Sequence, residues 1–170
     1  MAVSFLEESR AVLARTPATL DALLRGLPEC WTEATEGPGT WSPYVVIGHL
    51  IHAERTDWMP RLEIILKYGT GRPFDTFDRE GKPHAERQPL PALLDEFASL
   101  RRQNLLSLQL TEEQLDLQGT HPELGTVTVR QLLATWTAHD LAHILQISRV
   151  MAKRYKQEVG PWAEFLSVMK

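Results

Sequence analysis

The segment TWTAHDLAHILQISR, residues 135–149, contains two histidines at a spacing that suits metal binding. His139 and His143 are four residues apart in an apolar helical pattern, and Gln146 follows three residues later. On an α-helix each residue advances by about 100°, so side chains four apart share a face, with Cβ atoms about 6 Å apart. The spacing therefore predicts two imidazoles that can bind one ion at the edge of the core.

A complete metal site needs a third ligand from another part of the chain. Catalytic sites of the zinc type usually take three protein ligands and leave the last position open. His49 is predicted to point inward from an earlier helix and is the preferred third ligand, with His52, about 60° to one side, as the alternative. His84 and His121 fall in predicted loops and are expected to be solvated.

Three further residues bear on such a site. Asp140 falls on the apolar side of its helix, where a carboxylate needs a partner such as a backbone donor or an arginine. It lies about 60° from His143, so support of a ligand imidazole suits it better than direct ligation. Trp136 could form a wall of the site. Cys30 is the only cysteine, which excludes an intrachain disulfide and a thiolate cluster, and it is expected to be a buried hydrophobic residue.

Motifs of several other enzyme classes are absent from the sequence. It contains no HExxH, Walker, GxGxxG or GxSxG motif and no Glu-x-x-His pair of the ferritin-like type. No residue stands out as a general base, so a hydroxide on the ion or Asp140 would have to serve. A metal held by nitrogen and oxygen ligands is the chemistry that the remaining residues favour.

Composition indicates a folded protein without a nucleic-acid or membrane partner. The 170 residues are 43% hydrophobic and 24% charged, as in ordinary globular domains, and suggest a single domain over residues 1–170. The net charge is -4 and no stripe of Lys and Arg occurs, which gives little support to nucleic-acid binding. No apolar run reaches the length of a membrane span or a signal peptide. We expect a cytoplasmic protein that binds a small-molecule substrate.

Helical periodicity predicts the elements that position these residues. Four long helices are expected, over residues 4–27, 43–67, 90–110 and 129–153, followed by a short helix after residue 161. Pro17 is expected to kink the first helix or to break it briefly with Thr16 as a new cap, and Pro60 to bend the second helix. Ser42 and Thr128 are expected to cap the second and fourth helices. Residues 68–89 read as a long crossover loop and residues 119–128 as a turn-rich connection, with no segment that predicts a sheet. The fold class is therefore all-α, a four-helix bundle with a long crossover loop between helices 2 and 3 and a short C-terminal helix.

The second helix carries apolar residues on two sides. Opposite His49 lies a second apolar set, Ile47, Ile51, Trp58 and Ile65. A helix that is apolar on two sides needs two partners. Either the crossover loop or a second copy of the chain is expected to cover this face, and we predict a homodimer.

Three segments together resemble the DinB-like superfamily, also described as DinB/YfiT-like metalloenzymes. They are WSPYVVIGHL, TWTAHDLAHILQISR and VGPWAEFL, in this order along nearly the whole chain. The resemblance implies a four-helix bundle with a long crossover and a divalent metal held by His49, His139 and His143. Members of the superfamily include transferases and isomerases that use low-molecular-weight thiols such as bacillithiol or mycothiol, so a thiol cofactor is implied as well.

These observations favour a metal-dependent enzyme whose ion has open positions for water or a substrate thiol. A water or thiol bound to the ion would lose its proton near neutral pH and serve hydrolysis or thiol S-transfer. Three imidazoles are compatible with Ni, Zn, Fe or Mn. The alternative is a non-catalytic, metal-stabilised helical bundle that binds a small molecule or a protein partner.

Overall fold

The first predicted helix is two helices in the structure, a computed structural model that describes residues 3–79, 81 and 85–170. α1 (Phe5–Leu13) starts at Ser4, whose side chain caps its first turn, and α2 (Thr16–Leu24) follows. Pro17 has no N–H to donate to the carbonyl of Leu13, where α1 ends, so the interruption predicted at Pro17 is confirmed. The N-cap position of α2 is Arg15, not Thr16, and its side chain makes no capping hydrogen bond. A single turn, α3 (Glu29–Thr32), leads on to the second long segment.

The second predicted helix is also divided in two, where the sequence predicted one helix with a bend. α4 (Pro43–Thr56) starts at Ser42, whose hydroxyl accepts a hydrogen bond from the Val45 N–H, and α5 is Trp58–Tyr68. The break falls at Asp57 rather than at Pro60. Because Pro60 cannot donate to the Thr56 carbonyl, the helix ends there, and Pro60 then lies in the first turn of α5, where no donor is needed.

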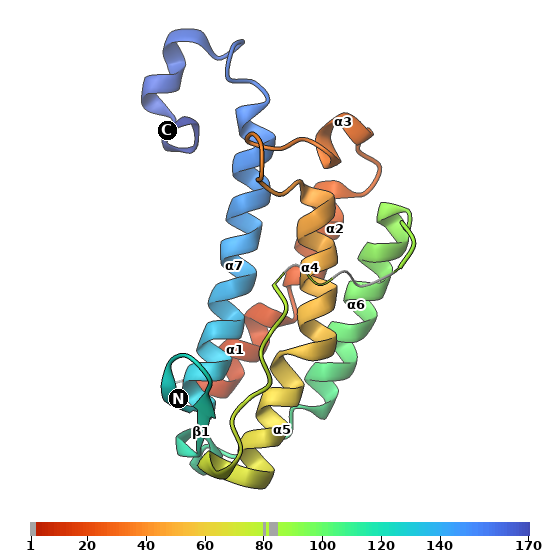
Figure 1. Ribbon diagram of the computed structural model, residues 1–170. Helices are drawn as coiled ribbons and strands as arrows, with labels where there is room; N and C mark the ends of the chain where they lie inside the picture. The colour runs from red at the N-terminus through yellow and green to blue at the C-terminus, as the bar shows by residue number, and fades with distance from the viewer. Residues whose placement is uncertain (1–2, 80, 82–84) are drawn as a thin grey trace.

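A long crossover then returns the chain to the start of the third helix. After a short 3-10 turn, η1 (Gly69–Gly71), the described residues form no regular element until α6 (Leu90–Ser107). Figure 1 shows this segment running back along α5 and α4, so that α6 runs in the same direction as they do. The fourth helix, α7 (Val129–Lys153), runs the opposite way and starts at Thr128, the predicted cap. The four-helix bundle with its crossover loop is confirmed.

The connection between α6 and α7 contains a hairpin that the sequence did not predict. After a 3-10 turn, η2 (Glu113–Asp116), strands β1 (Gln118–His121) and β2 (Gly125–Thr128) pair antiparallel. Each strand has only four residues, too few for an alternating pattern to show. Gly119 packs so closely under α5 that an added Cβ would lie 2.6 Å from Ile65 Cγ1. The hairpin is therefore fastened to the end of α5, and the first part of the crossover loop joins it through the Phe74 N–H, which donates to the Thr120 carbonyl.

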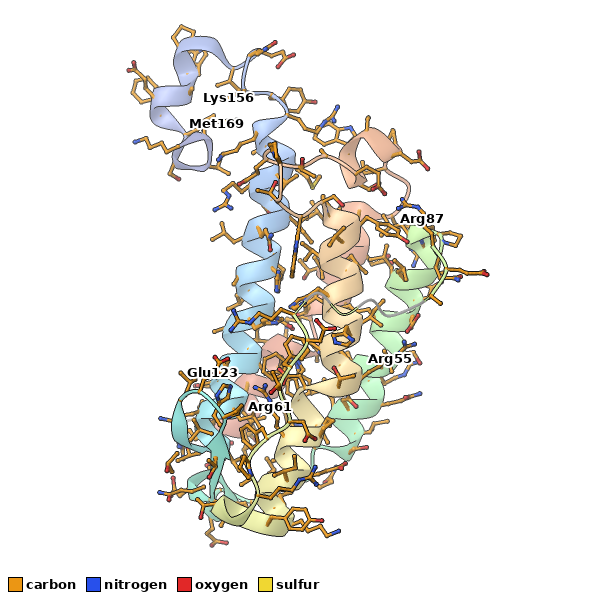
Figure 2. All side chains as sticks on the ribbon, in the orientation of Figure 1. Arg55, Arg61, Arg87, Glu123, Lys156 and Met169 are labelled. Carbon is orange, nitrogen blue, oxygen red and sulfur yellow. The ribbon has the colours of Figure 1, made fainter. Side chains whose placement is uncertain are left out.

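The C-terminal segment forms two short 3-10 helices instead of one α-helix. They are η3 (Gly160–Phe165) and η4 (Ser167–Met169), and they extend beyond the end of α7, in the region where Figure 2 labels Lys156 and Met169. Trp162 and Phe165 are 71% and 81% exposed. Short helices depend on tertiary packing, and these aromatic side chains have little of it.

Two apolar clusters fill the bundle, and a polar layer lies between them. On α4, Val46 belongs to one cluster and Ala53 to the other; on α7, Ile147 and Trp136 are divided in the same way. The buried polar residues Glu54, Arg101 and Asp140 lie between the two clusters. The apolar core thus leaves the middle of the bundle to polar side chains.

The apolar face predicted to pair with a second copy is covered within the chain. Ile47, Ile51, Trp58 and Ile65 are all at most 4% exposed. They give no support to a homodimer, which stays a prediction. None of the helices in the described part of the chain combines the length and the apolar surface that a membrane crossing requires.

Candidate metal site

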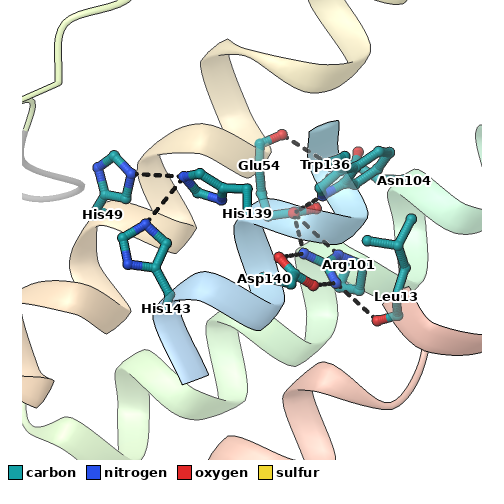
Figure 3. Close-up of polar contacts among 9 residues, drawn as sticks. All are labelled: Leu13, His49, Glu54, Arg101, Asn104, Trp136, His139, Asp140 and His143. Carbon is teal, nitrogen blue, oxygen red and sulfur yellow. Dashed lines mark hydrogen bonds and ion pairs between the residues drawn. The ribbon is translucent and has the colours of Figure 1, made fainter. Parts of the chain in front are cut away.

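Three imidazoles meet in the polar layer of the bundle. His139 and His143 project from successive turns of α7, and His49 projects from α4 toward them (Figure 3). The Nε2 atom of His139 lies 3.1 Å from Nε2 of His49 and 3.1 Å from Nε2 of His143. The structure thus brings together the three histidines that the sequence selected.

Their separation suits one shared cation. Imidazole nitrogens bind zinc at about 2.0–2.1 Å, so two ligands at tetrahedral or octahedral angles lie about 2.9–3.4 Å apart. All three ligand atoms lie within 4.8 Å of one another, and among the described residues they form a group that could hold a metal ion. The donor set is three neutral nitrogens, which suits Zn, Ni and Fe better than Mg or Ca.

The rings are held in the form that can bind a metal. Burial, followed by the charge of His143, lowers the pKa of His49 from 6.5 to about 4. Burial, followed by the charges of the other two histidines, lowers the pKa of His139 to about 3. The pKa of His143 is also lowered by burial, although its hydrogen bond to Gln146 opposes the shift. At neutral pH all three rings are uncharged, and each has a lone pair available for a cation.

One ligand ring has a hydrogen bond that fixes its orientation. The Nδ1 atom of His143 lies 2.8 Å from Oε1 of Gln146, one turn further along α7. With Nδ1–H donating to this oxygen, Nε2 carries the lone pair that faces the other histidines. Nδ1 of His139 is buried without a hydrogen-bond partner in the described part of the chain.

Aromatic rings surround the three histidines. Trp41 stacks on His143 at 6.2 Å and 8°, and Trp58 meets the edge of His139 at 5.1 Å. Trp136, expected from the sequence to wall the site, instead lies behind Trp58 and stacks on it at 5.7 Å. On a helix, residue 136 lies about 60° away from residue 139, which directs its ring into the apolar cluster. The walls therefore come from the start of α4 and the start of α5.

A cavity of about 540 Å³ opens beside the three rings. Its lining includes His139 and His143, the aromatic residues Trp58 and Phe77, and the half-buried His121 of the hairpin. A second cavity, of about 680 Å³, shares Trp41 and His49 with the first. A small molecule could therefore reach the histidines from a pocket bounded by the crossover loop and the hairpin.

A buried ionic network lies on the opposite side of His139. Arg101 of α6 donates a hydrogen bond from each of its five N–H groups (Figure 3). Two of them go to Glu54 Oε1, at 2.7 and 3.0 Å, and two go to the oxygens of Asp140, at 2.5 and 3.0 Å. The fifth goes to the Leu13 carbonyl at 2.8 Å. The predicted arginine partner of Asp140 is thus found. In the described structure Asp140 bonds to Arg101 and makes no hydrogen bond to a histidine.

The formal charge of this network is negative, because it contains two carboxylates and one guanidinium. Glu54 also accepts hydrogen bonds from Trp136 Nε1 at 3.0 Å and Asn104 Nδ2 at 2.9 Å. Two carboxylates therefore face a single guanidinium, all at most 3% exposed. The buried position of Arg101 could have been predicted from the sequence. Arg101 falls on the apolar face of α6 with Leu94 and Phe97, where a charge needs a partner.

The remaining residues considered from the sequence lie outside the histidine cluster. His52 packs on Phe77 at 5.3 Å and takes no part in the group of three. His121 is partly exposed on the hairpin and accepts backbone hydrogen bonds at Nδ1, outside the group of three. His84 lies outside the described residues. Cys30 is exposed rather than buried, because the single turn of α3 covers little of it.

A helical bundle with three convergent histidines defines the class of this protein, and the comparisons with known proteins define the family. The model of the DinB superfamily matches residues 13–147, so the chain belongs to the DinB superfamily. Its fold is similar to that of YfiT from Bacillus subtilis, described as "a probable metal-dependent hydrolase with an unusual four-helix bundle topology". The two share 20% sequence identity over 90% of each chain, with a TM-score of 0.74. The sequence matches no curated protein.

Proposed function

We propose that this protein is a divalent-metal-dependent hydrolase that acts on a small molecule, with the ion held by His49, His139 and His143. The observation that carries the proposal is that the three Nε2 atoms converge beside a cavity of about 540 Å³. Three protein ligands leave coordination positions open, and the cavity leaves room for water and a substrate. The description of YfiT as a probable metal-dependent hydrolase supports the same reaction class.

The chain's own residues prepare the site for this chemistry. A bound divalent ion would lower the pKa of a water molecule and polarise a substrate carbonyl. His49 and His139 offer uncharged nitrogens because burial lowers their pKa to about 4 and about 3. Gln146 holds the ring of His143, and Trp41 limits the access of bulk water by stacking on it.

The buried network supports a cation at this position. Asp140 follows His139 in α7, and with Glu54 it provides two carboxylates against the single charge of Arg101. A divalent ion beside this layer would meet a favourable electrostatic environment. Zn, Ni, Fe and Mn are all consistent with three imidazole ligands, and the occupant in the cell depends on supply as well as affinity.

Thiol S-transfer is the second candidate for the same site. A low-molecular-weight thiol bound at an open position would lose its proton, and the cavity could hold its electrophilic partner. A non-catalytic, metal-stabilised bundle is the remaining alternative. It predicts an ion whose coordination is closed by protein atoms, whereas the cavity beside the histidines favours an open one.

Reconstitution with single metals separates these possibilities. Metal-free protein is loaded with Zn²⁺, Ni²⁺ or Mn²⁺ and assayed with para-nitrophenyl acetate, and separately with a small thiol and an aromatic chloride. The proposal predicts metal-dependent ester hydrolysis that is lost in His139→Ala and kept in the control His52→Ala. Turnover only in the thiol assay would favour the transferase, and turnover that survives complete metal removal would contradict both.

A further inference from the structure

Asp57 is a buried carboxylate that faces the candidate site. It lies at the break between α4 and α5, is 5% exposed, and lines the same cavity as His139 and His143. The next residue, Trp58, packs against the ring of His139 with centroids 5.1 Å apart. The carboxylate of Asp57 is therefore next to the space that a substrate would occupy.

The hydrogen bonding of Asp57 is incomplete for a residue in its position. It occupies the N-cap position of α5 but makes no capping hydrogen bond, although aspartate usually accepts one there. Arg61 Nε lies 2.6 Å from Oδ1, and apart from this ion pair the carboxylate makes no hydrogen bond to a described residue. A donor in the cavity can therefore approach the carboxylate without displacing a capping hydrogen bond.

We propose that Asp57 is the proton acceptor of this site, an inference that rests on the proposed hydrolase function. As a water oxygen forms its bond to the carbonyl carbon of an ester, one water proton moves to the Asp57 carboxylate. When the bond from that carbon to the alcohol oxygen breaks, the proton passes to the departing oxygen. The products are the carboxylic acid and the alcohol, and Asp57 regains its charge.

The surroundings of Asp57 suit a group that both takes and returns a proton. Burial raises the pKa of Asp57 above its ordinary 3.8, whereas the charge and the hydrogen bond of Arg61 oppose the shift. A carboxylate whose pKa is raised toward the working pH is a better base than an exposed one. The other charged or titratable side chains that line the cavity, besides the histidine ligands, are Arg61, Arg79, His121 and Glu123.

A spectroscopic titration tests the placement of Asp57 without relying on turnover. Protein loaded with Co²⁺ changes its visible spectrum when a water at an open position loses its proton. Asp57→Asn removes a nearby negative charge and is expected to lower the midpoint of this transition by about one pH unit. Asp75→Asn makes the same change at a side chain that is 83% exposed on the crossover loop and is expected to leave the midpoint unchanged. An unchanged midpoint in Asp57→Asn would overturn the proposal.

Hydrolysis of para-nitrophenyl acetate by the Zn²⁺-loaded protein tests proton transfer itself. Asp57→Asn is expected to lower kcat by about 100-fold or more with little change in KM, and added formate should restore part of the rate. A kcat equal to that of the wild type would overturn the proposal. If the wild type hydrolyses no ester, the proposed function fails, whereas the cobalt midpoint still decides whether Asp57 faces the ion.

Loss of Asp57 leaves Arg61 without its ion-pair partner, and the side chain of Arg61 is only 14% exposed. If Asp57→Asn does not fold for this reason, the double variant with Arg61→Met removes both charges. Its cobalt midpoint and its kcat are then compared with those of Arg61→Met alone. The same downward shift and the same loss of kcat are expected, and identical values in the two variants would overturn the proposal.

Discussion

The Nε2 atoms of His49 and His139 lie 3.1 Å apart, although 90 residues separate the two histidines in the chain. Two ring nitrogens at this distance share either an N–H hydrogen bond or a cation. Nε2 of His139 also lies 3.1 Å from Nε2 of His143, and one N–H cannot point directly at two acceptors, whereas one cation can contact all three nitrogens. The arrangement is most simply explained as half of a metal site.

Removal of one ligand should abolish tight metal binding. In His143→Ala we expect Zn²⁺ affinity to fall by more than about 100-fold, since the loss of an outer hydrogen-bond partner alone costs about 10–100-fold. Competition with a chromophoric chelator measures the affinity. His52→Ala, which changes a histidine on α4 outside the group of three, is the matched control. Equal affinity in the wild type and His143→Ala would show that the ion binds elsewhere.

Gln146 should affect metal binding through the ring of His143. Gln146→Leu keeps the size of the side chain but removes the oxygen that lies 2.8 Å from Nδ1. The ring then loses its fixed orientation, and we expect a loss in Zn²⁺ affinity of about 10–100-fold. Gln103→Leu, at an exposed position of α6, should bind Zn²⁺ as the wild type does. A wild-type affinity in Gln146→Leu would show that this hydrogen bond does not orient the ligand.

The metal-free protein should lose stability in acid. The folded-state pKa of His49 is about 4 and that of His139 about 3, below the ordinary value of 6.5, so the unfolded chain binds more protons than the folded chain between these values. The contribution of these two histidines to the free energy of unfolding should therefore be largest above about pH 6.5. It should fall as the pH drops toward 3. Urea unfolding at several pH values measures it. The double variant His49→Phe/His139→Phe should show a weaker dependence of the free energy of unfolding on pH. If its dependence is as steep as that of the wild type, other groups cause the loss of stability in acid.

The Arg101 network should be essential to the fold. Arg101→Met leaves the carboxylates of Glu54 and Asp140 buried without a cation, and breaking a buried ion pair in this way costs about 3–5 kcal/mol. Arg102→Met, at the exposed neighbouring position, should change stability by less than about 0.5 kcal/mol. The free energy of unfolding from urea denaturation checks both values. A small effect in Arg101→Met would mean that the carboxylates are protonated or reach water.

Local signals allowed most of the helical architecture to be predicted. Ser42 and Thr128 cap their helices where the sequence placed them, because N-cap hydrogen bonds involve residues only three positions apart. A bend was predicted at Pro60, whereas the structure has a break at Asp57, one turn earlier, because a proline removes the hydrogen bond to the preceding turn. The hairpin at residues 118–128 depends on packing against α5, a contact that the short strands do not encode.

The site was predictable only where its residues share one helix face. The spacing of His139 and His143 on α7 identified them directly, whereas the choice of His49 required an assumption about which face of α4 points inward. Asp57 and Trp41 were missed as site residues because their positions depend on a helix break and on a loop. Three-dimensional contacts between α4, α5 and the crossover loop, not sequence spacing, bring them to the cavity.

A crystal structure of the Zn²⁺-loaded protein, with anomalous diffraction recorded at the zinc edge, tests the central claim most directly. We predict one anomalous peak about 2.0–2.1 Å from Nε2 of His49, His139 and His143, with at least one further position filled by solvent. A peak bound by other residues, or the absence of any peak between α4 and α7 in fully loaded protein, would contradict the assignment.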